Sequence, residues 1–251
     1  MKKLAGVMFT YNCFSQDYCF EEAIKSLMEF CDHVFVVDAS SIDGTRERRM
    51  CMSRNVTFTF LSHDKWAAFH GKEKLSHFTN IAIRQAREAG YEYVFSLQAD
   101  EIVHESCYWA IRNAVDSGFE AFLVGRVNLW GNPYTYLRVP ENRQPCSTQV
   151  IRLAKSKYEA YDDAESLAAP TIANYSDHIR IYHMGFVRKR EVMVDKIKHM
   201  QADVFQVTPD AKLQGMDVFN PWAWFDKTDV ALIDERLPHL IQDWAKQREY
   251  E

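Results

Sequence analysis

Two runs of polar residues, each directly after an apolar stretch, carry side chains that could do chemistry: VVDASSIDGT from Val36 and SLQADE from Ser96. In the second run, Asp100 and Glu101 are adjacent carboxylates, whose desolvation must be offset by a cation, solvent or hydrogen-bond donors. A divalent cation with oxygen ligands would serve, since Mg²⁺ and Mn²⁺ accept carboxylates and share substrate phosphates. The alternative has equal weight: a carboxylate pair stabilised by the dipole of a following helix.

The first run centres on Asp38, which is followed by Ala39, Ser40 and Ser41. An aspartate in this position can cap the turn and the next helix, and position alone favours that interpretation. The combination of this run with a later QADE is more specific than either run by itself. Together they indicate a ligand site.

The elements that position these residues alternate along the first half of the chain. Runs of β-branched and aromatic residues predict strands, and apolar residues at helical spacing predict helices between them. We therefore expect an α/β fold, with a mostly parallel sheet and helices on both faces, and ligands bound outside the carboxyl ends of the strands. The predicted strands are Leu4–Phe9, His33–Asp38, Val56–Leu61, Tyr93–Gln98 and Ala121–Leu129; the predicted helices are Phe20–Cys31, one from Thr45, Leu75–Ala89 and Glu105–Ser117.

The second half is less regular. Strands are predicted at Thr148–Leu153 and Ile179–Met184, on either side of the acidic segment YDDAES from Tyr161, and a helix at Val187–Phe205. The tail from Thr228 has an amphipathic pattern interrupted by Pro238. We expect one domain over residues 1–205 with a helical C-terminal extension over residues 206–251 packed on it.

Composition excludes several classes of protein. The chain has 251 residues, 47% of them hydrophobic, and a formal net charge of -5. No overall positive field attracts nucleic acid, although Arg188, Lys189 and Arg190 could form a local basic patch. No run approaches the roughly 20 apolar residues of a membrane helix. The six cysteines show no CxxC pair, so we expect reduced thiols and a cytoplasmic protein.

The order of these motifs resembles that of the family 2 glycosyltransferases of GT-A (Rossmann-like) fold. The resemblance rests on TYN from Thr10, VVDASSIDGT, a helix bearing Lys74 and Asn80, and SLQADE. It is close through SLQADE and continues more loosely to Phe205. It implies that Thr10, Tyr11 and Asp38 hold the base and ribose of a nucleotide, and that Lys74 contacts phosphate. The candidate nucleotide-sugar site consists of Thr10, Tyr11, Asn12, Asp38, Ser40, Lys74, Asn80, Gln98 and Asp100.

The resemblance also implies a metal. Asp100 matches the aspartate of a DxD motif that ligates Mn²⁺ or Mg²⁺, and His183 is a candidate further ligand. Gln98 stands where the family usually has the first aspartate, and it offers only a neutral carbonyl oxygen. A lone histidine in an apolar strand is otherwise an ordinary core residue.

A base is needed because an acceptor hydroxyl loses its proton as it attacks the anomeric carbon. In inverting family members the base comes from the region of YDDAES, so we favour Asp163, followed by Glu165 and Asp162. The alternative is a solvated acidic loop. The expected donor is a nucleoside-diphosphate sugar, with UDP as the expected nucleotide. The acceptor stays open: a saccharide, a lipid-linked saccharide, a protein or a hydroxymethylated DNA base, although the acidic pI of about 6.0 disfavours nucleic acid.

Two other functions compete with this hypothesis. A sugar nucleotidyltransferase uses a similar sheet, but needs a glycine-rich basic loop after the first strand, where this chain has NCFSQDY. A non-catalytic relative that binds a sugar or nucleotide is compatible with Gln98.

Overall fold

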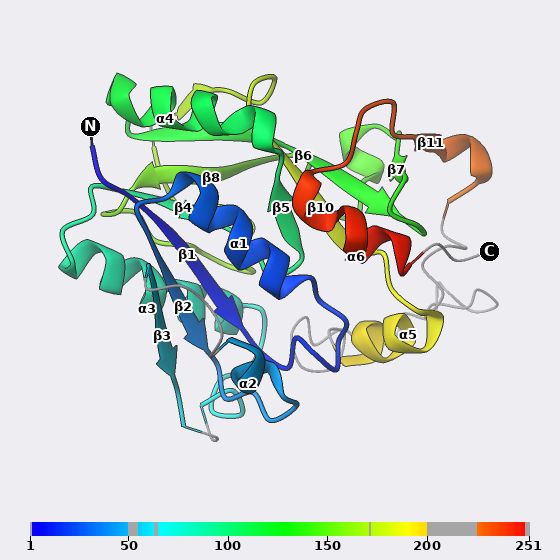
Figure 1. Cartoon of the computed structure of the whole chain (residues 1–251), viewed down its shortest axis with the longest axis horizontal. Helices are drawn as coiled ribbons and strands as arrows, with labels where there is room; N and C mark the ends of the chain where they lie inside the picture. Colours follow the sequence, from blue (N-terminus) through cyan, green and yellow to red (C-terminus); the bar gives the residue numbers. More distant parts are fainter. Residues whose placement is uncertain (1, 50–54, 63–64, 171, 200–224, 249–251) are drawn as a thin grey trace.

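A mixed sheet runs through the centre of the chain (Figure 1). The computed structural model describes residues 2–49, 55–62, 65–170, 172–199 and 225–248. Within them the sheet follows the order β11-β7-β6-β8-β4-β1-β2-β3, with β5, β9 and β10 attached beside this path. The strands are β1 (Leu4–Thr10), β2 (His33–Asp38), β3 (Val56–Phe60), β4 (Tyr93–Ser96), β5 (Glu101–Val103), β6 (Ala121–Trp130), β7 (Thr135–Leu137), β8 (Gln149–Lys155), β9 (Ile172–Asn174), β10 (Arg180–Phe186) and β11 (Val230–Leu232).

The parallel part of the sheet is β4-β1-β2-β3. After β1 the chain builds β2 and β3 on one side and then places β4 on the other. The order of strands therefore reverses between β1 and β4, and such a reversal opens a crevice at the carboxyl ends of the two strands. The predicted ligand residues after β1 and β4 lie at this crevice.

Beyond β4 the sheet is mixed, which corrects the prediction of a mostly parallel sheet. β8 runs antiparallel to both of its neighbours, β4 and β6. No helix of the usual crossover kind lies between β6 and β8, so the chain returns in the opposite direction. Four strands were missed, β5, β7, β9 and β11, and each has only three residues.

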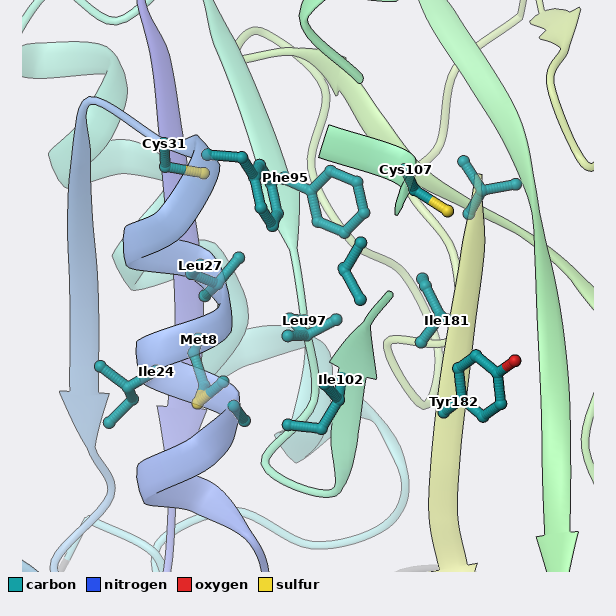
Figure 2. Packing of buried hydrophobic residues seen from close by; sticks show 14 of the residues in the cluster. Met8, Ile24, Leu27, Cys31, Phe95, Leu97, Ile102, Cys107, Ile181 and Tyr182 are labelled. Carbon is teal, nitrogen blue, oxygen red and sulfur yellow. The ribbon is translucent and has the colours of Figure 1, made fainter. Parts of the chain in front are cut away.

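Helices cover both faces of the parallel strands, as the burial of β1 on both faces requires. Leu4 and Met8 belong to the core that includes α1, whereas Ala5 and Val7 pack with Ala82 of α3 and its neighbours. Figure 2 shows Ile24 and Leu27 of α1 beside Met8, with Phe95 of β4 and Leu97 just after β4 next to them. The helices are α1 (Phe20–Phe30), α2 (Thr45–Arg49), α3 (Glu73–Glu88), α4 (Tyr108–Ser117), α5 (Arg190–His199) and α6 (Gln242–Lys246).

The chain after β10 differs from its prediction in two respects. The helix predicted from Val187 begins at Arg190, and residues beyond 199 up to 224, including the proposed boundary at 205, lie outside the described part. The described tail, 225–248, is not purely helical, because β11 pairs antiparallel with β7. α6 follows as a short helix.

No helix in the described ranges is long and apolar enough to cross a membrane. The five cysteines that the structure describes, Cys13, Cys19, Cys31, Cys107 and Cys146, are free thiols.

Gly6 of β1 lies directly against Leu27 of α1. A Cβ at this position would meet Leu27 Cβ at 2.9 Å. We predict that Gly6→Ala lowers the free energy of unfolding by about 1–3 kcal/mol through overpacking, measured by urea denaturation. In a Leu27→Gly background the same change should cost much less, because the Cβ that the new methyl group would meet is then absent. An equal cost in both backgrounds would contradict this packing.

Candidate active site

A cavity of about 520 Å³ lies at the crevice between the carboxyl ends of β1 and β4. Its walls come from the turn after β1, the Gln98–Asp100 segment, the acidic turn around Asp163, the end of β10 and α5. Segments far apart in the sequence therefore meet at the edge of the sheet where the sequence predicts ligand binding.

One wall of the cavity is aromatic. The rings of Tyr11 and Trp66 stack at a centroid distance of 3.9 Å with 10° between their planes, and Phe78 lies behind Trp66 at 5.6 Å. Lys74 Nζ lies 4.4 Å from the centroid of the Trp66 ring. The indole N–H of Trp66 is buried without a hydrogen-bond partner among the described residues. A planar ligand with an acceptor atom, such as a nucleobase, suits this wall.

Asp38 is fully buried, and its carboxylate is occupied by donors from the protein itself. Oδ1 accepts from the backbone N–H of Ser41 at 2.8 Å and from Arg46 Nε at 2.8 Å. Oδ2 accepts from Ser41 Oγ at 2.6 Å and from Thr10 Oγ1 at 3.2 Å. Asp38 does not line the cavity. Its position favours the alternative in which it organises the turns after β1 and β2.

Asn12, in the turn after β1, also joins that turn to the turn after β2. Its Oδ1 accepts from the N–H of Ile42 at 2.9 Å, and its own N–H donates to Ser41 Oγ at 2.9 Å. Asn12 and Ser40 both have positive φ, 44° and 75°, in the left-handed region that asparagine tolerates best. Ser40 donates to the carbonyl of Ser62. Both turns are therefore held in fixed shapes.

Lys74 and Asn80 of α3 lie apart from the main cavity, at a second hollow of about 360 Å³ that Asp162 also lines. The side chain of Asn80 binds the backbone of Ala160 at two points, through Nδ2 to the carbonyl at 2.9 Å and Oδ1 to the N–H at 2.7 Å. Asn80 therefore fixes the start of the acidic turn.

Asp100 lines the main cavity and is only 5% exposed. Its Oδ2 lies 3.1 Å from Arg188 Nη2 and 3.4 Å from Lys196 Nζ. Burial raises the pKa of Asp100, but Lys196, His183 and Arg188 lower it by a larger amount. The pKa of Asp100 therefore lies well below its usual range. The negative charge of Asp100 is thus paired with cations from the protein.

His183 of β10 is neutral in this site. Burial lowers the pKa of His183 to about 4. The amide nitrogen of Asn128 donates to Gln144 Oε1 and the Cys146 carbonyl, which leaves Asn128 Oδ1 as the acceptor for His183 Nδ1–H at 3.0 Å. Nε2 then carries the lone pair; it lies 3.8 Å from Asp100 Oδ2 and has no hydrogen-bond donor among the residues that the structure describes.

A divalent cation does not fit these residues as they are arranged. Asp100 Oδ2 and His183 Nε2 are two ligand-type atoms, but the described residues contain no group of three histidines, cysteines or carboxylates that could hold a metal. Arg188 and Lys196 already contact Asp100 Oδ2, so a metal bound to that oxygen would have to displace one of them. The expected Mn²⁺ or Mg²⁺ stays a prediction, and we derive no step through it.

Glu101, next to Asp100, belongs to a separate buried ion-pair network. Its Oε1 lies 2.7 Å from Arg152 Nη2 and 3.4 Å from Arg126 Nη1, with all three side chains almost fully buried. Burial raises the pKa of Glu101, and the two arginines outweigh it, so the pKa is lowered. Arg126 also binds Glu165 Oε1 at 2.6 Å, and Arg152 Nη1 donates to the carbonyl of Ala164 at 2.7 Å. The network anchors the acidic turn to the sheet.

The acidic turn presents its three carboxylates in three different ways. Asp162 pairs with Lys72 at 2.5 Å, away from the main cavity. Asp163 and Glu165 both line the cavity. Burial and then the charge of Glu165 raise the pKa of Asp163. Burial also raises the pKa of Glu165, but Arg126 outweighs it, so the pKa of Glu165 is lowered.

The structure brings most of the predicted site residues to the cavity, together with two that sequence reasoning missed. Trp66 and Lys196 line it without a preceding motif signal. Arg188, considered as part of a surface basic patch, is instead 1% exposed and bound to Asp100. The predicted residues at the cavity are Thr10, Tyr11, Asn12, Gln98, Asp100, Asp163, Glu165 and His183, whereas Asp38, Ser40, Lys74, Asn80 and Asp162 do not line it.

Comparisons with known proteins give structural matches alone. No family model and no curated protein matches the sequence. The structure is similar to that of S. aureus TarS. TarS residues 1–349 align with a TM-score of 0.48 and 17% identity over 80% of this chain and 66% of that chain. The same fragment in complex with UDP-GlcNAc gives 0.48 and 16%, and TarS itself gives 0.47 and 16% over 90% of this chain. The chain spans 66% of the TarS fragment and 44% of TarS.

The Glu101 network generates a stability prediction. Glu101→Gln leaves Arg126 and Arg152 without their buried counter-charge, and should lower the free energy of unfolding by about 3–5 kcal/mol. Since the pKa of Glu101 is lowered in the folded state, its stabilising effect is present above the unfolded pKa of about 4.3 and is lost as the pH falls through the folded pKa. Urea denaturation between neutral and acidic pH should show a weaker acid dependence in the variant.

The exposed Glu88 of α3 offers the matched control, Glu88→Gln, which should behave like the wild type. A Glu101→Gln protein within about 0.5 kcal/mol of the wild type would mean that the network does not hold the turn.

Proposed function

We propose that this chain is a glycosyltransferase that moves a sugar from a nucleoside diphosphate to an acceptor hydroxyl. One observation carries the proposal: a single cavity combines an aromatic wall at Tyr11 and Trp66, the charged centre at Asp100 and Lys196, and a carboxylate of raised pKa at Asp163. A nucleobase suits the aromatic wall, a diphosphate suits the positive charge of the centre, and an acceptor hydroxyl needs a carboxylate that accepts its proton. The order of motifs TYN, VVDASSIDGT and SLQADE supports the same function.

The proposed reaction is a single displacement with inversion. The acceptor oxygen forms a bond to the anomeric carbon, and the bond from that carbon to the diphosphate oxygen breaks. The nucleoside diphosphate leaves with the electron pair, and the proton of the acceptor hydroxyl passes to a carboxylate of the acidic turn. Asp100, His183 and Gln98 also line the cavity, and in the proposed reaction the sugar lies beside them.

Asp163 is the carboxylate best suited to act as the base. It faces the cavity, and its raised pKa makes it a stronger base than an ordinary aspartate. Glu165 is held by Arg126 at 2.6 Å, which stabilises its charge and weakens it as a base. Asp162 is paired with Lys72 outside the cavity. Asp38 and Asn80 act by positioning, since they hold the turns around the site.

A sugar- or nucleotide-binding protein without turnover is the second candidate, favoured by the cations that already occupy Asp100. Two measurements separate the candidates. Thermal unfolding with a panel of UDP-, GDP- and other nucleotide sugars identifies the donor, because a ligand of the folded state raises the melting temperature. Release of nucleoside diphosphate from that donor, with Mn²⁺, Mg²⁺ or EDTA, then measures turnover. Stabilisation with release supports the enzyme; stabilisation without release, for any acceptor supplied, supports the binding protein.

Asp163→Asn should lower the rate of transfer about 10²- to 10⁴-fold with little change in donor affinity, because the variant keeps the shape of the side chain and loses the base. Asp162→Asn is the contrasting variant and should keep most of the activity. A reversed result, with loss in Asp162→Asn and not in Asp163→Asn, would contradict the assignment.

The same base predicts a pH dependence. Asp163 works when it is deprotonated, so kcat/KM should fall as the pH drops through its raised pKa. Glu165→Gln removes the neighbouring charge that raises this pKa, so the acidic limb of the pH–rate profile should move to lower pH. A limb that stays in place or moves upward would show that Glu165 does not act on the base.

A further inference from the structure

Asp100 has more positive charge beside it than one carboxylate requires. Arg188 and Lys196 both contact Oδ2. Both cations also lie over the ring of Tyr18, with Arg188 Cζ at 4.3 Å and Lys196 Nζ at 5.3 Å from its centroid. Since Asp100 carries a single negative charge, one of these two cations is surplus in the ligand-free protein.

Arg188 is the permanent partner of Asp100. It is 1% exposed and does not line the cavity. Its guanidinium donates to the carbonyls of Gln16 at 2.8 Å, Met184 at 3.1 Å and Gly185, as well as to Asp100. These bonds join the turn after β1 to the end of β10. A side chain held at so many points stays in place when a ligand enters.

Lys196 of α5 is the surplus cation. Among the described residues that line the cavity, it is the only lysine or arginine. Its ammonium has three N–H donors and contacts two acceptors in the described structure, Gly185 O at 2.9 Å and Asp100 Oδ2 at 3.4 Å. The longer contact, to Asp100, can be given up because Arg188 also pairs with Asp100 Oδ2. The flexible stem of a lysine allows the ammonium to move without the backbone.

We infer that Lys196 binds the diphosphate of the donor, moving its ammonium from Asp100 to a phosphate oxygen while Arg188 keeps Asp100 paired. The inference rests on the proposed function. It supplies from the protein itself the positive charge that a departing nucleoside diphosphate needs. It also gives Asp100 a new role, as the residue that holds the cation in the cavity before the donor arrives.

The test compares ligands with and without phosphate. Calorimetry in a buffer with EDTA measures the affinities of UDP, uridine and inorganic pyrophosphate for the full chain. Lys196→Met should weaken UDP and pyrophosphate on the order of tenfold or more and leave uridine unchanged, because a charge-assisted contact to phosphate is lost. Lys196→Arg should restore most of the UDP affinity. Lys198→Met, an exposed position on the same helix, is the matched control and should bind like the wild type.

Three outcomes would overturn the inference. Lys196→Met and Lys196→Gln could both bind UDP as tightly as the wild type, or could lose UDP and uridine equally. The wild type could also bind UDP only when Mn²⁺ or Mg²⁺ is added, in which case a metal meets the diphosphate. Each of these leaves the proposed function standing, whereas a wild type that binds neither UDP, uridine nor any other nucleotide of the panel overturns both.

Discussion

The buried carboxylate of Glu101 is the group on which the rest of the site depends. It begins β5 and binds Arg126 of β6 and Arg152 of β8, both of which continue to the acidic turn at Glu165 and Ala164. A charge in a low-dielectric interior must be matched by charges and hydrogen bonds of good geometry. This requirement fixes the distance of the turn from the sheet. The acidic turn, which brings Asp163 and Glu165 to the cavity, is thus held in place by these buried ion pairs.

The adjacent Asp100 is satisfied from the opposite direction, by Arg188 and Lys196. Two adjacent carboxylates are therefore paired with separate sets of cations: Glu101 with arginines of β6 and β8, and Asp100 with Lys196 of α5 and Arg188 just before it. Figure 1 shows where these elements lie. The arginines beside Glu101 anchor the acidic turn, which carries the proposed catalytic base Asp163. The cations beside Asp100 bring positive charge to the cavity. The turns after β1 and β2, tied together through Asp38 and Asn12, form the remaining wall.

The sequence predicted what local patterns encode. β1, β2 and β4 read as buried runs, and α1 and α3 as helices at their observed places, because burial on a helix or strand repeats at a fixed period. The carboxyl ends of these strands then placed Tyr11 and Asp100 at one crevice. Asp38 followed the family motif, but its carboxylate is consumed by internal donors. Arg126, Arg152 and Lys196 could not be predicted, since each acts through partners far away in the sequence and lies in a strand or helix with no distinguishing pattern. The strand β8 was predicted at Thr148–Leu153, but its antiparallel direction was not, because strand direction depends on long-range pairing.

A crystal structure of the protein with an intact nucleoside-diphosphate sugar, beginning with UDP-sugars, tests the central claim most directly. We predict that the nucleobase lies against Tyr11 and Trp66, the diphosphate contacts Lys196, and the sugar lies between Asp100 and the carboxylate of Asp163. A nucleotide bound at the second hollow beside Lys74 and Asn80, or a sugar turned away from Asp163, would contradict the proposed glycosyltransferase site.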